Sequence, residues 1–136
     1  MESRPPGTPP TRPLVLFIEG HIDTRALYSL ALSAMGFDVV AARDGDDAYR
    51  RAWDAHPDIV VTDLAMPGYD AWRFLQDLKD DPDTRDIPVV AVTGHVEQSI
   101  RERAERDGFA AFVPKPCPPD TLALELRRVL DGHVHE

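Results

Sequence analysis

The sequence has a single cysteine, very few lysines and no long run of apolar residues. Because Cys117 is the only cysteine among the 136 residues, no disulfide can form within the chain, which fits a reducing cytoplasm. There is neither a signal peptide nor an apolar run long enough to span a bilayer, so we expect no membrane partner. Acidic residues outnumber basic ones by 24 to 15. The net charge of −9 argues against nucleic acid as a direct partner, since phosphate backbones bind basic surfaces.

The scarcity of lysine draws attention to the two positions where it occurs. Of the 15 basic residues only Lys79 and Lys115 are lysine. One interpretation is chance. The other is that Lys115, which follows an apolar run, supplies a compact point charge for a phosphoryl group, where the planar fork of arginine would not fit.

The length of the chain favours one domain with a tail at each end. Residues 1–13 contain five prolines, so we expect a disordered or polyproline-like tail there. The domain is predicted over residues 14–131, and residues 132–136 are predicted to fray.

Between the tails, apolar runs alternate with helical patterns, which predicts an α/β fold. Five such units imply a doubly wound parallel sheet, because right-handed crossovers place helices on both of its faces. The strands are expected at residues 14–18, 37–42, 59–62, 87–92 and 108–113. The helices are expected at residues 22–35, 46–55, 70–79, 96–107 and 119–130.

Two of these helices carry specific expectations. Asp23 is the expected N-cap of the first helix, and its buried stripe is expected to comprise Leu27, Leu30, Ala31 and Ala34. The fourth helix is highly charged and leaves only Val96, Ile100 and Ala104 as anchors. It is a solvated helix with ion pairs along its surface, and a weakly anchored helix is also what a conformational switch requires.

Polar residues follow four of the predicted strands. Asp63 comes directly after residues 59–62, and Glu19, Thr93 and Lys115 end three other runs. On its own, Asp63 reads equally well as an aspartate that begins a turn. Parallel strands, however, would bring all four residues to one edge of the sheet, where open α/β folds bind ligands. Carboxylates hold a hard cation, and Thr and Lys donate to phosphoryl oxygens.

With these residues in place, the chain resembles the receiver domain of bacterial two-component response regulators. The resemblance covers roughly residues 14–130. It is carried by Asp63 with Met66-Pro67-Gly68, by Thr93-Gly94, and by Lys115-Pro116, in this order and at strand ends. It implies a flavodoxin-like five-stranded sheet, in the order 2-1-3-4-5, with five helices.

The resemblance also implies roles for the residues at the sheet edge. Asp63 would accept a phosphoryl group as an aspartyl phosphate, Thr93 and Lys115 would bind its oxygens, and Mg²⁺ would offset the developing charge. The metal ligands would be Glu19, Asp63 and the backbone carbonyl of Ala65. A cis peptide between Lys115 and Pro116 is expected on the same basis.

The sequence departs from the family at Gly20, where a second acidic residue is usual. Losing this carboxylate should weaken magnesium binding, although water or the longer side chain of Glu19 could compensate. Phe112 stands where the family often has an aromatic residue whose rotamer follows phosphorylation. Because it has no hydroxyl, a switch here would depend on packing, and a plain core residue is an equally good interpretation.

The resulting hypothesis is a stand-alone response regulator receiver, or a fragment of a larger regulator, that is not an enzyme. A histidine kinase or phosphotransfer protein would phosphorylate Asp63, and the chain, a monomer or weak homodimer, would bind a downstream protein. The alternative is a degenerate receiver that acts as a phosphate-independent scaffold, motivated by Gly20. A third hypothesis is a hydrolase with Asp63 as nucleophile. Ala65 speaks against it, because such phosphatases usually have a second aspartate at that position.

Overall fold

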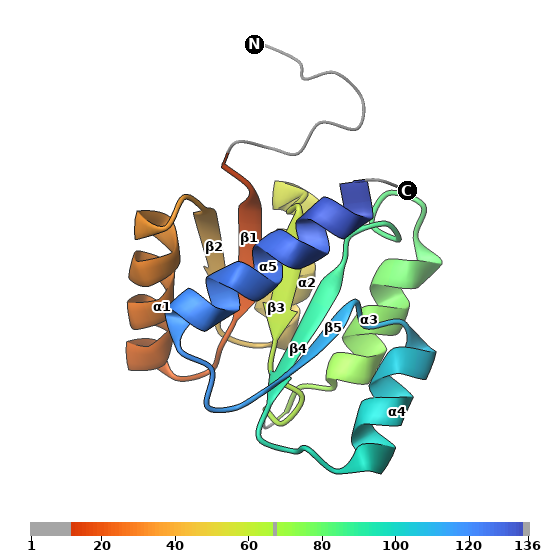
Figure 1. Cartoon of the computed structure of the whole chain (residues 1–136). Helices are drawn as coiled ribbons and strands as arrows, with labels where there is room; N and C mark the ends of the chain where they lie inside the picture. The colour runs from red at the N-terminus through yellow and green to blue at the C-terminus, as the bar shows by residue number, and fades with distance from the viewer. Residues whose placement is uncertain (1–11, 67, 135–136) are drawn as a thin grey trace.

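Five parallel strands form one sheet in the order β2-β1-β3-β4-β5, which confirms the expected topology (Figure 1). The computed structural model describes residues 12–66 and 68–134, so the tail predicted at residues 1–13 lies almost wholly outside the described residues. The strands are β1 (Leu14–Ile18), β2 (Asp38–Ala42), β3 (Ile59–Thr62), β4 (Val89–Thr93) and β5 (Ala111–Pro114).

Five helices cover the two faces of this sheet. They are α1 (Ile22–Ala34), α2 (Gly45–Ala55), α3 (Ala71–Asp80), α4 (Gln98–Asp107) and α5 (Pro119–Val134). Helices α1 and α5 pack on one face, and α2, α3 and α4 pack on the other (Figure 1). Helix α5 extends beyond the predicted end at Leu130, and α4 begins two residues later than predicted.

The core consists of two apolar clusters, one on each face of the sheet. Alternation along β1 shows how they arise, because successive side chains of a strand point to opposite faces. Val15 and Phe17 join the cluster under α1 and α5, whereas Leu16 and Ile18 join the cluster under the other three helices. Since both faces of the strands are buried, the strands read as continuous apolar runs in the sequence.

The prediction for the buried face of α1 was wrong. Leu27 and Leu30 are 59% and 73% exposed, and Leu32 is the buried residue of the helix. Tyr28 faces inward with Leu32, because its ring stacks on Phe17 of β1 at 5.5 Å between ring centroids. Helix α1 has few charged residues, so two of its faces are apolar and the pattern does not determine which one meets the sheet.

The start of α1 also differs from the expectation. The N-cap position is His21, not Asp23, which lies within the first turn, and no side chain caps this helix end. The backbone N–H of His21 donates instead to Oε2 of Glu19 at 3.0 Å. In α4, the expected anchor Val96 precedes the helix and is 51% exposed.

At the amino edge of the sheet, Arg12 fixes the first described residues to the fold. Its guanidinium donates to Oδ1 of Asp38 at 2.9 Å and to the carbonyl oxygens of Phe37 and Ser33 at 2.7 and 3.1 Å. These contacts join the residues before β1 to the end of α1 and the start of β2. In the ranges that the structure describes, no helix is long and apolar enough to cross a membrane.

Two substitutions in α1 test which of its faces is buried. We expect Leu32→Ala to lower the free energy of unfolding by about 2–5 kcal/mol, because it leaves a cavity in the core. Leu30→Ala, the matched control, should change it by less than about 0.5 kcal/mol, because the side chain is exposed. Urea denaturation measures both values. A larger loss for Leu30→Ala than for Leu32→Ala would mean that α1 packs in the orientation first inferred from its sequence.

Candidate functional site

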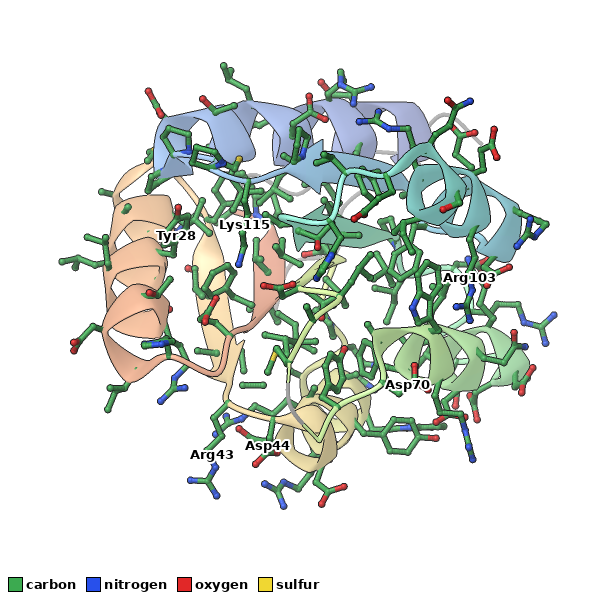
Figure 2. All side chains as sticks on the ribbon, turned by 90° about the horizontal axis from the view of Figure 1, so that it is seen from below. Tyr28, Arg43, Asp44, Asp70, Arg103 and Lys115 are labelled. Atoms are coloured by element: carbon green, nitrogen blue, oxygen red, sulfur yellow. The ribbon has the colours of Figure 1, made fainter. Side chains whose placement is uncertain are left out.

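A cavity of about 640 Å³ opens at the carboxyl edge of the sheet, between α1 and the start of α5. Its deeper wall is apolar and includes Phe17, Val61 and Leu122, whereas Glu19, Asp63 and Lys115 form its polar side. Figure 2 looks onto this edge and shows Tyr28 and Lys115, which both line the cavity, close to one another. Three of the four residues expected to meet at this edge therefore line one cavity.

Asp63 follows β3 directly and is held through both oxygens of its carboxylate. Oδ2 accepts a short hydrogen bond of 2.5 Å from Nζ of Lys115, and Oδ1 accepts from the backbone N–H of Ala65 at 2.9 Å. The Asp63 side chain is 16% exposed and that of Lys115 is 43% exposed. This arrangement orients the carboxylate toward the cavity and places a cation beside it, where negative charge on an attached group would be stabilised.

Lys115 reaches Asp63 from the end of β5, across the end of β4. Its backbone N–H donates to the carbonyl oxygen of Thr93 at 2.9 Å, which continues the pairing of β4 with β5 beyond the strands. The peptide bond between Lys115 and Pro116 is cis, as expected. The ammonium group thus belongs to a loop whose backbone is tied to the neighbouring strand.

Thr93 ends β4, next to β3 in the sheet, and is fully buried. Its Oγ1 accepts a hydrogen bond from the backbone N–H of His95 at 3.1 Å. This bond uses a lone pair of the hydroxyl, so the O–H proton is still available for donation to another acceptor. Thr93 is not among the residues that line the cavity, although it lies at the same edge of the sheet.

The cavity offers two carboxylates to a metal ion, one fewer than the resemblance to the family implies. Glu19 and Asp63 are the carboxylates of the cavity, and Oε2 of Glu19 already accepts from the N–H of His21. Among residues 12–66 and 68–134, no group of three or more His, Cys, Asp or Glu side chains is arranged to hold a metal ion. Hard oxygen donors of the right kind are present, but one carboxylate is missing.

The missing carboxylate has room at Gly20. A Cβ atom built there would lie 3.6 Å from Cε of Met66 and 3.8 Å from the carbonyl oxygen of Arg43, which are ordinary van der Waals distances. An aspartate can therefore be introduced at this position without a steric conflict at Cβ. The absence of a carboxylate at position 20 therefore does not follow from a lack of space.

The sequence did not reveal the contribution of Tyr28 and Cys117 to the cavity wall. The Tyr28 hydroxyl donates to the carbonyl oxygen of Cys117 at 2.7 Å and so links α1 to the loop before α5. Burial raises the pKa of Tyr28, which keeps this hydroxyl a donor, and burial also raises the pKa of the Cys117 thiol. The position of Tyr28 four residues before Leu32 was the available signal, because it marks a second apolar face of α1.

The comparison with known families agrees with this geometry. The model of the response regulator receiver domain matches residues 15–127. The chain belongs to this family. The match includes all the residues at the sheet edge, from Glu19 to Lys115, and it leaves out only short segments at the two ends.

Individual relatives place the chain within this family of receivers. PhoB, the phosphate regulon transcriptional regulatory protein of Escherichia coli K12, is 31% identical over 116 residues, which are 85% of this chain and 51% of PhoB. The chain thus spans about half the length of PhoB. DivK, the polar-differentiation response regulator of Brucella ovis, is 30% identical over 102 residues, or 75% of this chain and 83% of DivK. The structure of the chemotaxis response regulator CheY4 of Vibrio cholerae has a TM-score of 0.81 at 26% identity, covering 88% of this chain and 99% of CheY4.

Membership in this family indicates what a receiver domain generally does. Receiver domains are signalling domains of two-component systems that interact with histidine kinases or phosphotransfer proteins, and they generally bind Mg²⁺ at the phosphorylation site. In this chain, Glu19, Asp63 and the carbonyl of Ala65 would hold the ion. The assignment of these ligands, and of Thr93 and Lys115 to the phosphoryl group, is a proposal that follows the family resemblance, and the contact between Lys115 and Asp63 supports it.

Restoring an acidic residue at position 20 tests the strength of the donor set. We expect Gly20→Asp to tighten magnesium binding by about tenfold, or roughly 1.4 kcal/mol, because a third carboxylate adds charge around a hard cation. Without magnesium the same variant should melt at a lower temperature, since the carboxylates repel one another, and magnesium should restore part of the loss. Calorimetric titration and thermal melting measure the two effects.

The matched control is Gly20→Asn, which has nearly the same shape and no charge. It should leave magnesium affinity within about twofold of the parent chain. Equal affinities for all three proteins would show that water or Glu19 already supplies the missing ligand.

Proposed function

We propose that this receiver is phosphorylated on Asp63 by a histidine kinase or phosphotransfer protein and signals by binding a downstream protein when phosphorylated. The observation that carries the proposal is the contact between Nζ of Lys115 and Oδ2 of Asp63, 2.5 Å apart at the polar side of the cavity. It pairs a nucleophilic oxygen with the cation that would stabilise the product. We also propose that the protein is cytoplasmic, because a chain with one cysteine forms no internal disulfide and so fits a reducing compartment.

The proposed transfer is a displacement at phosphorus. An oxygen of the Asp63 carboxylate attacks the phosphorus of the donor's phosphohistidine, a P–O bond forms, and the P–N bond breaks so that its electron pair returns to the imidazole. The ammonium of Lys115 then pairs with one phosphoryl oxygen, and the hydroxyl of Thr93 donates to another. A magnesium ion held by Glu19, Asp63 and the Ala65 carbonyl would offset the charge on the phosphoryl oxygens.

The exposed apolar side chains of α1 support a protein as the phosphoryl donor. Ile22, at the start of α1 and three residues after Glu19, is 69% exposed, and Leu27 and Leu30 continue an apolar surface along the helix. Exposed apolar surface next to a reactive group is typical of a protein interface. We therefore propose that the histidine kinase or phosphotransfer protein docks on α1.

Two features favour a signalling role over enzymatic turnover. DivK, 83% of which is covered by the match, is named a response regulator, which supports a signalling role for a receiver of this kind. Ala65 offers no general acid two residues after Asp63, so the aspartyl phosphate lacks the group that phosphatases use for turnover. The alternative, a degenerate receiver that acts as a phosphate-independent scaffold, is motivated by Gly20. The intact pair of Asp63 and Lys115 argues against this alternative.

Phosphodonor labelling tests the proposed acceptor. Incubation with acetyl phosphate and magnesium should add one phosphoryl group, which mass spectrometry of peptides places on Asp63. Asp63→Asn should abolish labelling, because the amide is not a nucleophile. Glu19→Gln, a second carboxylate of the same cavity, should slow labelling and leave the modified residue unchanged. Labelling that persists in Asp63→Asn, or sustained release of phosphate from small esters, would contradict the proposal.

A further inference from the structure

Helix α4 is held to the rest of the fold by very little apolar burial. Within α4, Ala104 is the only buried residue, and Ile100 is half-buried. The N-cap residue Glu97 makes no capping hydrogen bond through its side chain. The segment from Gly94 to Glu97, which joins α4 to Thr93, is exposed throughout. Apolar contact alone leaves the position of this helix weakly determined.

Two arginines supply the contacts that burial lacks. The guanidinium of Arg101 lies over the ring of Phe112 in β5, 5.0 Å from its centroid, and that of Arg103 lies over Trp72 in α3 at 4.0 Å. Both distances are within the range of a cation–π interaction. Figure 2 shows Arg103 of α4 facing α3.

The spacing of these residues around the helix explains how they act together. At 3.6 residues per turn, Arg101 and Arg103 fall on opposite sides of Ala104, which faces the sheet. The small alanine lets α4 approach the sheet closely, and each arginine reaches an aromatic ring on a different neighbouring element. Helix α4 is thus fixed from two sides.

Two elements connect α4 to the residues around Asp63, namely strand β5 and the segment between Thr93 and α4. Phe112 pairs with Ala91 in the register of β4 and β5, and three residues later Lys115 contacts Asp63. Thr93 ends β4 and continues into the exposed segment before α4. A phosphoryl group on Asp63 would engage both Lys115 and Thr93, so it would act on the strand under Arg101 and on the segment that leads into α4.

We propose that Arg101 on Phe112 and Arg103 on Trp72 form a latch that holds α4 in its resting position, and that phosphorylation of Asp63 opens it. The inference rests on the proposed phosphorylation of Asp63. In this proposal, two arginine–aromatic contacts supply the free energy that favours the resting position of α4. Phe112 has no hydroxyl, so it contributes to the switch only through packing and the contact with Arg101. A contact of this kind weakens as soon as the guanidinium leaves the face of the ring, so a small displacement of α4 breaks it.

The fluorescence of Trp72 reports on one half of the latch directly. The other tryptophan, Trp53, lies in α2 against Tyr49, so Trp53→Phe leaves Trp72 as the only tryptophan, which is excited selectively over the three tyrosines. In this background, acetyl phosphate with magnesium should shift the emission to longer wavelength, because Arg103 leaves the ring and water replaces it. In Arg103→Gln the emission should already be shifted, and phosphorylation should add little.

The extent of phosphorylation reports on the other half. A latch that opposes the phosphorylated state lowers the labelled fraction of Asp63, so Arg101→Gln and Phe112→Leu should each raise the ratio of labelled to unlabelled protein by about two- to fivefold. The double variant should show no further increase, because both changes remove the same contact. The matched control is Arg106→Gln, which removes an α4 arginine that pairs with Asp107 at 3.7 Å and is largely exposed.

The outcomes separate the latch from the proposed function. If Asp63 is labelled and the Trp72 emission is unchanged, the latch is refuted and the phosphorylation stands. If Arg106→Gln raises labelling as much as Arg101→Gln does, helix charge and not the aromatic contact is responsible, and the latch is again refuted. If no labelling occurs in any variant, the proposed function fails and the latch fails with it.

Discussion

The contact between the Lys115 ammonium and the Asp63 carboxylate is the constraint around which the molecule is arranged. The two residues follow β3 and β5, which are separated in the sheet by β4. Because β3, β4 and β5 are parallel, their carboxyl ends lie at one edge of the sheet, where the two charged side chains meet. The hydrogen bond from the Lys115 N–H to the Thr93 carbonyl maintains this level. The contact between Lys115 and Asp63 therefore occurs together with three features of the fold. These are the order of the strands, their register and the cis peptide after Lys115.

Much of the fold and of the sheet edge could be predicted because local and global signals agree. Continuous apolar runs that end in polar residues indicate buried parallel strands, and Asp63, Thr93 and Lys115 all occur at such ends. The buried face of α1 could not be predicted in this way. Leu27 and Leu30 have the spacing of a core stripe, but the stacking of Tyr28 on Phe17, set by tertiary contacts, turns them outward. The hydrogen bond from His21 to Glu19 likewise depends on the local backbone and has no signature in the residue pattern.

Helix α4 has few apolar contacts and the cavity has few carboxylates, although the helix and the cavity lie on opposite faces of the sheet. Where α4 lacks buried side chains, arginines reach aromatic rings on β5 and α3. In the cavity, the ammonium of Lys115 already pairs with the carboxylate of Asp63. In both places a charged side chain does what burial or a metal ion does in other proteins, and such interactions respond strongly to nearby changes in charge.

The attachment of Arg12 to Asp38 and to the end of α1 has a practical consequence. These contacts lie where β1 begins, at the edge of the sheet opposite to the one that carries Asp63. Helix α5 also runs back from the Asp63 edge, so its last turn lies toward the same end of the molecule as the start of β1 (Figure 1). A fluorophore, an affinity tag or a surface tether joined at either of these places would therefore sit about one sheet length from the Asp63 carboxylate. The domain can be immobilised with its cavity facing solution and open to a large partner.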